Sequence, residues 1–310
     1  MAATPPAGAT PLLDAETLRQ LERLSIVHLG SVLTGLTGQR ARASGARGLE
    51  FADYRPYAPG DELRRVDWNI YARLGEAFVK TAPSEGHLAI ALLIDGSASM
   101  DGSSSGGGGA SRSSNFRYAQ SLAATLGAIA LLRADAAEAF VLADGEAWAG
   151  GRLSTPRNVV PLIEELSDLP RGARTDLPAS VRAYRRHNTD AEVAVLITDG
   201  LVERDSLIEA LGELRRSADS ATLVHVIDDG ELDVDFRGPV ELRDRETGER
   251  MLVEASSALS RRYVASFERM AEDASAAARD AEVGYVRALT SVRPLDLLIE
   301  AANSAELVAL

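Results

Sequence analysis

The stretch His87–Ile94 (HLAIALLI), followed directly by Asp95-Gly-Ser97-Ala-Ser99, decides the fold. An unbroken apolar run that ends at a carboxylate is typical of a strand buried on both faces of a parallel sheet. Further strands are expected at 139–143, 192–198, 221–227 and 284–290, with helices at 116–134, 158–167, 176–186, 206–217, 256–281 and from 293 onward. This alternation predicts an α/β protein with a doubly wound, mostly parallel sheet that is flanked by helices.

Other segments are expected around this sheet. An amphipathic helix is predicted over 14–29, and an irregular stretch rich in Gly, Pro and Arg follows over 34–73. Residues 102–114 (GSSSGGGGASRSS) are typical of a flexible loop, and Glu241–Glu254 is typical of an exposed β-hairpin with a Thr-Gly turn. We therefore expect an N-terminal region over 1–86 and an α/β domain over 87–310, with a hairpin insertion near 238–255.

Composition excludes several classes of protein. The 33 basic residues are outnumbered by 46 acidic ones, so the formal net charge of −13 argues against nucleic-acid binding. The absence of cysteine excludes thiolate metal sites and disulfides, and because Lys80 is the only lysine, no P-loop is present. The first residues lack a signal-peptide pattern, and the apolar stretch 122–132 is too short to span a membrane, so we expect a cytoplasmic protein with no membrane span.

Oxygen-bearing side chains follow the central strand. Asp95, Ser97 and Ser99 share one loop, and ligands of doubly wound sheets bind beyond the carboxyl ends of the strands. Thr175, in Gly172-Ala-Arg-Thr-Asp176, and Asp199, at the end of Leu196-Ile-Thr-Asp-Gly200, are expected at the same edge. A set of hard oxygen donors without imidazole or thiolate predicts Mg²⁺ (or Mn²⁺) rather than zinc.

These three segments resemble the metal-ion-dependent adhesion site of von Willebrand factor A domains. The resemblance implies that Ser97, Ser99 and Thr175 ligate the metal directly or through water and that Asp95 and Asp199 hold its coordinated waters. It also implies an open coordination position, which the carboxylate of a protein partner fills.

A second resemblance covers the N-terminal part of the chain. Glu50–Trp68 (EFADYRPYAPGDELRRVDW), with Ala72-Arg73 and Lys80, is similar to the segment that defines the bacterial DUF58 family. Members of that family pair this segment with a von Willebrand A-like domain, and their genes often neighbour those of MoxR-type AAA+ ATPases. The resemblance implies an adaptor that acts in a chaperone-like way with such an ATPase or its client, and it implies no catalytic residue.

Several residues have a plainer interpretation. Asp176 is expected to cap a helix, Asp228 and Asp229 to cap loops, and His225 to lie in the core. No histidine is placed as a base for Ser97 or Ser99, and no nucleophile elbow is present, so we expect a non-enzymatic interaction module. The alternatives are a metal-dependent hydrolase that uses the same site, or a metal-free scaffold that contacts its partners through residues 34–73.

Overall fold

The computed structural model describes residues 11–23, 54–56, 78–80, 88–101, 114–174, 176–187, 190–232, 238–244 and 247–307. Its strands are β1 (Tyr54–Pro56), β2 (Phe78–Lys80), β3 (Ala89–Asp95), β4 (Ala136–Ala143), β5 (Glu146–Ala149), β6 (Val193–Thr198), β7 (Ser220–Ile227), β8 (Gly238–Arg243), β9 (Arg250–Ala255) and β10 (Gly284–Leu289). Its α-helices are α1 (Ala15–Arg23), α4 (Asn115–Leu132), α5 (Val159–Ser167), α6 (Leu177–Arg186), α7 (Arg204–Arg215), α8 (Asp229–Leu232), α9 (Ser257–Asp280) and α10 (Pro294–Leu307), with 3₁₀ turns η3 (Ala98–Asp101) and η4 (Pro156–Asn158).

The main sheet has six strands in the order β10-β7-β6-β3-β4-β5. Strands β10, β7, β6, β3 and β4 pair in parallel, and β5 closes one edge as the antiparallel arm of a turn after β4. From β3 the chain first adds β4 on one side and later adds β6 on the other. The order therefore reverses between β3 and β6, which is the point where sheets of this kind bind their ligands.

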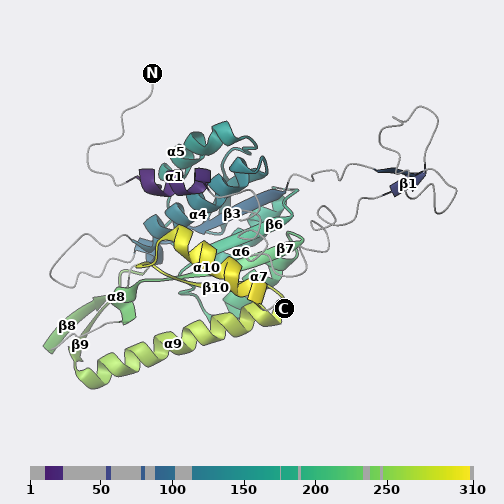
Figure 1. Ribbon diagram of the computed structural model, residues 1–310. Coiled ribbons are helices and arrows are strands. Elements are labelled where there is room, and N and C mark those ends of the chain that lie inside the picture. Colours follow the sequence, from purple (N-terminus) through teal and green to yellow (C-terminus); the bar gives the residue numbers. More distant parts are fainter. Residues whose placement is uncertain are drawn as a thin grey trace.

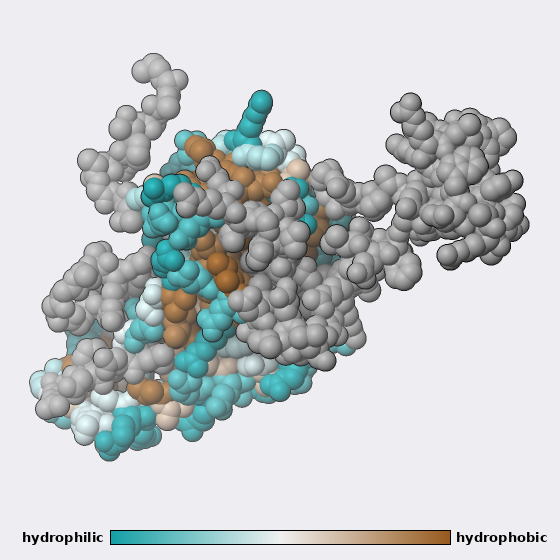
Figure 2. Space-filling model, viewed as in Figure 1, coloured by the Kyte–Doolittle hydropathy of each residue, from teal (hydrophilic) through white to brown (hydrophobic). Residues whose placement is uncertain are grey.

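Helices cover both faces of this sheet because the side chains of its strands alternate between two apolar cores. Ile90, Leu92 and Ile94 of β3 face the core that contains α1, α4, α5 and α10, and Ala91 and Leu93 face the core that contains α6, α7 and α9. Figure 1 shows α1, α4 and α5 on one side of the sheet and the long helix α9 on the other. Figure 2 shows apolar residues in the middle of this view and hydrophilic residues along the lower rim, where α9 lies in Figure 1.

The expected α/β class is confirmed, with the central strand where the apolar run placed it. All seven residues of β3 are buried. The short elements β1, β2, β5 and α8 were not predicted, because three or four residues are too few to establish a period. The expected helix over 14–29 is described only as far as Arg23, and most of the 34–73 stretch and the 102–114 loop lie outside the described residues.

Two small antiparallel pairs lie outside the main sheet. Strand β1 pairs with β2, and β8 pairs with β9 to form a hairpin within the stretch where the sequence indicated one. Figure 1 shows the β8–β9 hairpin next to the first turns of α9.

Candidate metal centre at the carboxyl edge of the sheet

Strand β3 ends in a buried carboxylate that lies between two hydrogen-bond donors. Asp95 is 1% exposed. One of its carboxylate oxygens, Oδ1, accepts a hydrogen bond from the Ser97 amide at 3.0 Å. The other, Oδ2, accepts one from the Thr198 hydroxyl at 2.7 Å. Both oxygens are thus oriented by the protein, and the carboxylate is fixed at the edge of the sheet.

The hydroxyl groups of the same loop lie side by side. The Ser97 and Ser99 Oγ atoms are 2.9 Å apart. The tight turn that carries them requires a glycine, since a Cβ added at Gly96 would lie 2.6 Å from Val141 Cγ1. The carboxylate that ends β3 and the two hydroxyls that follow it therefore lie on one short segment, as the sequence predicted.

The neighbouring strand β6 ends in a second buried carboxylate. Asp199 is 2% exposed, and its Oδ1 accepts a hydrogen bond from the Leu201 amide at 3.1 Å. Gly200 has a φ of +66°, a left-handed conformation that glycine adopts without strain. Strands β3 and β6 are adjacent, so Asp95 and Asp199 share the same edge at the point where the strand order reverses.

The loop that leads to Thr175 is tied to this edge, although Thr175 itself lies outside the described residues. The Gly172 amide donates to the Gly96 carbonyl at 3.0 Å. The Asp144 carboxylate, in the turn after β4, accepts from the Arg174 amide at 2.9 Å. On the other side of Thr175, Asp176 caps α6 by accepting from the Ala179 amide at 3.1 Å, which confirms the expected cap.

The chemistry of these donors fits a hard divalent cation. Two carboxylates and two hydroxyls are available from Asp95, Asp199, Ser97 and Ser99, and oxygen-only sets of this kind suit Mg²⁺ or Mn²⁺. Among the residues described, no group of three or more His, Asp or Glu side chains is arranged to hold a metal ion. A cation at this edge would therefore depend on the serine hydroxyls, on water and on a partner in addition to the two carboxylates.

Thr198 was not singled out by the sequence analysis, and His225 was expected only as a core residue. Thr198 donates to Asp95 and at the same time accepts from the Gly200 amide at 3.0 Å, so it links the two carboxylate loops. The feature of the sequence that could have identified Thr198 is its position in the Thr-Asp-Gly turn, directly before Asp199. His225 lies beneath the same turn with its Nε2 atom 2.9 Å from the Asp199 carbonyl oxygen, and it is fully buried, as expected for a core histidine.

Asp228 and Asp229, after β7, bond to nearby loops. Asp228 is 2% exposed and accepts from the Gly230 amide at 2.8 Å. Asp229 accepts from the Ser291 amide, also at 2.8 Å, in the turn that follows β10. These bonds confirm the expected role of both carboxylates as loop caps.

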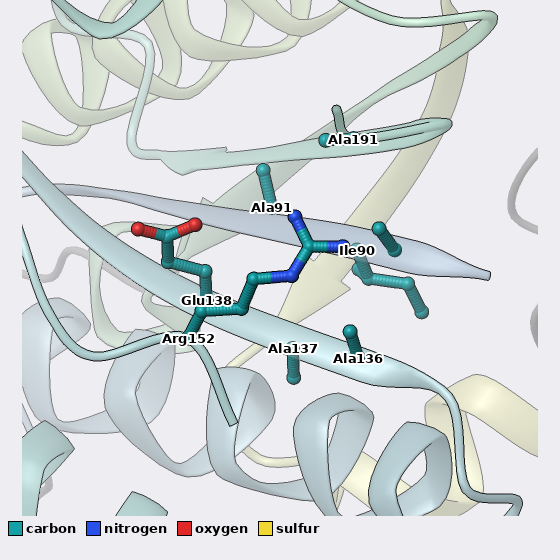
Figure 3. Close-up of a pocket in the computed structure, with 8 residues that line it drawn as sticks. Ile90, Ala91, Ala136, Ala137, Glu138, Arg152 and Ala191 are labelled. Atoms are coloured by element: carbon teal, nitrogen blue, oxygen red, sulfur yellow. The ribbon is translucent and has the colours of Figure 1, made fainter. Parts of the chain in front are cut away.

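A small pocket lies at the opposite edge of the sheet, at the amino ends of β3 and β4 (Figure 3). The Arg152 guanidinium lies over Ile90 and Ala91 in this view, and the Glu138 carboxylate points away from it. Burial raises the pKa of Glu138. Because the pocket is separated from Asp95 by the length of β3, it does not form part of the candidate metal centre.

The fold and this edge define the class of protein: an α/β protein with a doubly wound sheet that gathers oxygen donors at its switch point. The family follows from a match over most of the chain. Residues 53–276 match the family described as "Protein of unknown function DUF58", and the chain belongs to that family.

The similar proteins are themselves uncharacterized or only distantly similar. Uncharacterized proteins of Mycobacterium bovis and Mycobacterium tuberculosis are 28% identical over 209 residues, which is 65% of this chain. The match spans 62% of the length of those relatives. Among solved structures, BatB of Bacteroides thetaiotaomicron is 18% identical with a TM-score of 0.43, covering 71% of this chain and 98% of BatB.

The comparisons correct one expectation. An aerotolerance-related membrane protein of Bacteroides fragilis is 17% identical with a TM-score of 0.39, covering 70% of this chain and 99% of that one. A membrane spanning protein of Vibrio fischeri is 15% identical with a TM-score of 0.26, covering 72% and 98%. These names contradict the cytoplasmic location expected from the sequence, which rested on the lack of a targeting signal. Among the helices in the described ranges, none has both the length and the apolar character needed to cross a bilayer.

Proposed function

We propose that this chain is a metal-dependent protein-interaction module. In this proposal, Asp95, Ser97, Ser99, Thr175 and Asp199 hold Mg²⁺ or Mn²⁺ at the carboxyl edge of the sheet, directly or through water. The ion accepts a carboxylate of a protein partner at an open coordination position. The observation that carries the proposal is the pair of buried carboxylates on adjacent strands, with the Ser97 and Ser99 hydroxyls 2.9 Å apart beside the first of them.

Electrostatics favour a cation at this edge. Two carboxylates that are withdrawn from water on neighbouring strands repel each other and lose solvation, and a divalent ion relieves both costs. The hydrogen bonds to Asp95 fix its orientation before a metal arrives, which reduces the ordering that binding requires. A hard cation with an incomplete set of protein ligands keeps affinity for a further anionic oxygen.

The strand order supports a likeness to von Willebrand A domains. When the six strands are numbered along the chain, the sheet reads 3-2-1-4-5-6 with an antiparallel edge strand, and the candidate site lies at the end of strand 1. The proposed partner is an acidic side chain of a MoxR-type AAA+ ATPase or of its client, and this choice rests on the family resemblance alone. The net charge of −13 acts against an acidic partner only at close range, because physiological salt screens charges beyond about 8 Å.

The described residues favour binding over hydrolysis. A histidine base for a hydrolase would have to lie near the reacting water, and His225, a described histidine close to this edge, has both ring nitrogens engaged beneath the Asp199 turn. We therefore propose no catalytic residue.

Binding of a purified MoxR-type ATPase to the immobilised chain tests the proposal. The experiment compares excess Mg²⁺ with EDTA, in the wild type, in Asp95→Asn and in the control Asp219→Asn. Asp219 is an exposed carboxylate beside the amino end of β7. We expect binding that is lost in EDTA and in Asp95→Asn but kept in Asp219→Asn. Binding that is indifferent to EDTA would favour a metal-free scaffold instead.

A further inference from the structure

His225 is held in one orientation by its two partners. Its Nε2 atom lies 2.9 Å from the Asp199 carbonyl oxygen and its Nδ1 atom lies 3.0 Å from the Tyr285 hydroxyl. A carbonyl oxygen only accepts hydrogen bonds, so Nε2 carries the hydrogen. The second ring nitrogen, Nδ1, is engaged with the Tyr285 hydroxyl, so both nitrogens of the ring have a partner.

The hydrogen bond from Nε2 fixes the peptide group between Asp199 and Gly200. The imidazole holds the carbonyl of that peptide, and the amide on its other side donates to Thr198 Oγ1 at 3.0 Å. The contact is close, since a Cβ added at Gly200 would lie 3.2 Å from His225 Nε2. The ring thus supports the turn from below and determines which way its amide points.

Thr198 connects the Asp199–Gly200 peptide to the candidate site. Because its oxygen accepts from Gly200, its hydrogen is directed to Asp95 Oδ2 at 2.7 Å. A directional chain of hydrogen bonds therefore runs from His225 Nε2 through the Asp199–Gly200 peptide and Thr198 to Asp95. Tyr285 lies on β10, and its hydroxyl is also 3.4 Å from the Ala271 carbonyl oxygen of α9.

We propose that His225 is a positioning residue for the metal centre: as the Nε2–H tautomer it fixes the Asp199–Gly200 peptide and, through Thr198, the carboxylate of Asp95. This inference rests on the proposed function and deepens it, because it assigns a determinant of metal affinity to a side chain that does not touch the metal. Groups that orient metal ligands typically change affinity by about 10- to 100-fold when they are lost.

Two amide substitutions separate the two bonds of the ring. His225→Gln places an amide donor near the position of Nε2, and His225→Asn places one near Nδ1, so only the Gln variant keeps a donor for the Asp199 carbonyl. Tyr285→Phe removes the outer hydroxyl from a half-buried position. Val226→Ala is the control, because it weakens the same buried strand and has no side-chain hydrogen bond to lose.

Affinity for Mn²⁺ alone, measured by electron paramagnetic resonance, gives the first readout. We expect His225→Asn to raise the Kd by about 10-fold or more, His225→Gln to restore most of the loss and Tyr285→Phe to raise the Kd by about threefold, with Val226→Ala unchanged. If the wild type binds Mn²⁺ and both His225→Asn and Tyr285→Phe bind it equally well, the inference is overturned and the proposed function stands. If the wild type binds no Mn²⁺, the proposed function fails and this assignment fails with it.

A second readout needs no metal. The ¹⁵N spectrum of the His225 ring should show one hydrogen, on Nε2, and the amide signal of Gly200 should move in His225→Asn but much less in His225→Gln. A hydrogen on Nδ1 in the wild type, or a Gly200 signal that is the same in all variants, would overturn the inference whatever the metal does.

Discussion

Replacement of Thr198 by valine tests how strongly the two carboxylate loops are joined. The hydroxyl of Thr198 donates to a buried carboxylate at 2.7 Å and accepts from the Gly200 amide at 3.0 Å. A hydrogen bond to a charged group contributes about 1.5–3 kcal/mol, and a buried amide left without an acceptor costs about 1–3 kcal/mol. Valine keeps the shape and loses both bonds, so Thr198→Val should lower the free energy of unfolding by about 4 kcal/mol.

Thr198→Ser is the matched variant. Serine keeps the hydroxyl and removes one buried methyl group, which should cost about 1 kcal/mol. Urea unfolding followed by circular dichroism, with EDTA present in every sample, measures both values without a contribution from metal. A fall of less than about 1 kcal/mol in the free energy of unfolding of Thr198→Val, or an equal fall in Thr198→Ser, would refute the role of these two hydrogen bonds.

Two further predictions concern the supports of the site. Gly172→Ala should lower stability by about 1–3 kcal/mol, because the added Cβ would lie 2.4 Å from Ala143 Cβ, whereas Gly151→Ala meets its nearest atom at 3.6 Å and should be neutral in the same thermal melts. Equal melting temperatures for the two variants would contradict this. The second prediction is a dependence of stability on pH that arises from His225. Burial lowers the pKa of His225 from 6.5 to about 4. The contribution of the neutral ring to the free energy of unfolding is therefore complete above pH 6.5 and is lost as the pH falls toward 4. Between pH 7 and pH 5, the free energy of unfolding measured with urea should fall by about 2 kcal/mol more in the wild type than in His225→Gln. An equal fall in the two proteins would show that the ring is not held neutral.

The sequence predicted the sheet well because buried parallel strands have a clear signal. The run before Asp95 and the run before Asp199 are continuous and apolar, and both became fully buried strands. Strand β5 has only one buried residue in four, so no periodicity marks it. Its position at the edge follows from a turn after β4, in which Asp144 adopts a φ of +52°.

The candidate site could be predicted only in part. The carboxylates and hydroxyls are visible in the sequence because they follow strands directly, and their positions agree with that reading. The bonds that orient them were not foreseeable, since they join residues that lie far apart in the chain: Thr198 reaches Asp95 across two adjacent strands, and Tyr285 reaches His225 across two others. Only the strand order and register bring these pairs together.

The location was the expectation that failed. A cytoplasmic location does not follow from the lack of a targeting pattern or of a long apolar stretch in the sequence, because such patterns say little about where a protein works. The chain also matches only 62% of the length of its mycobacterial relatives.

Calorimetric titration of Mn²⁺ into the wild type, Asp95→Asn, Ser99→Ala and Asp219→Asn tests the central claim most directly. The account predicts one saturable site in the wild type and in Asp219→Asn, no measurable site in Asp95→Asn and a weaker one in Ser99→Ala. The absence of binding in the wild type, or equal binding in Asp95→Asn, would contradict a metal centre at this edge of the sheet.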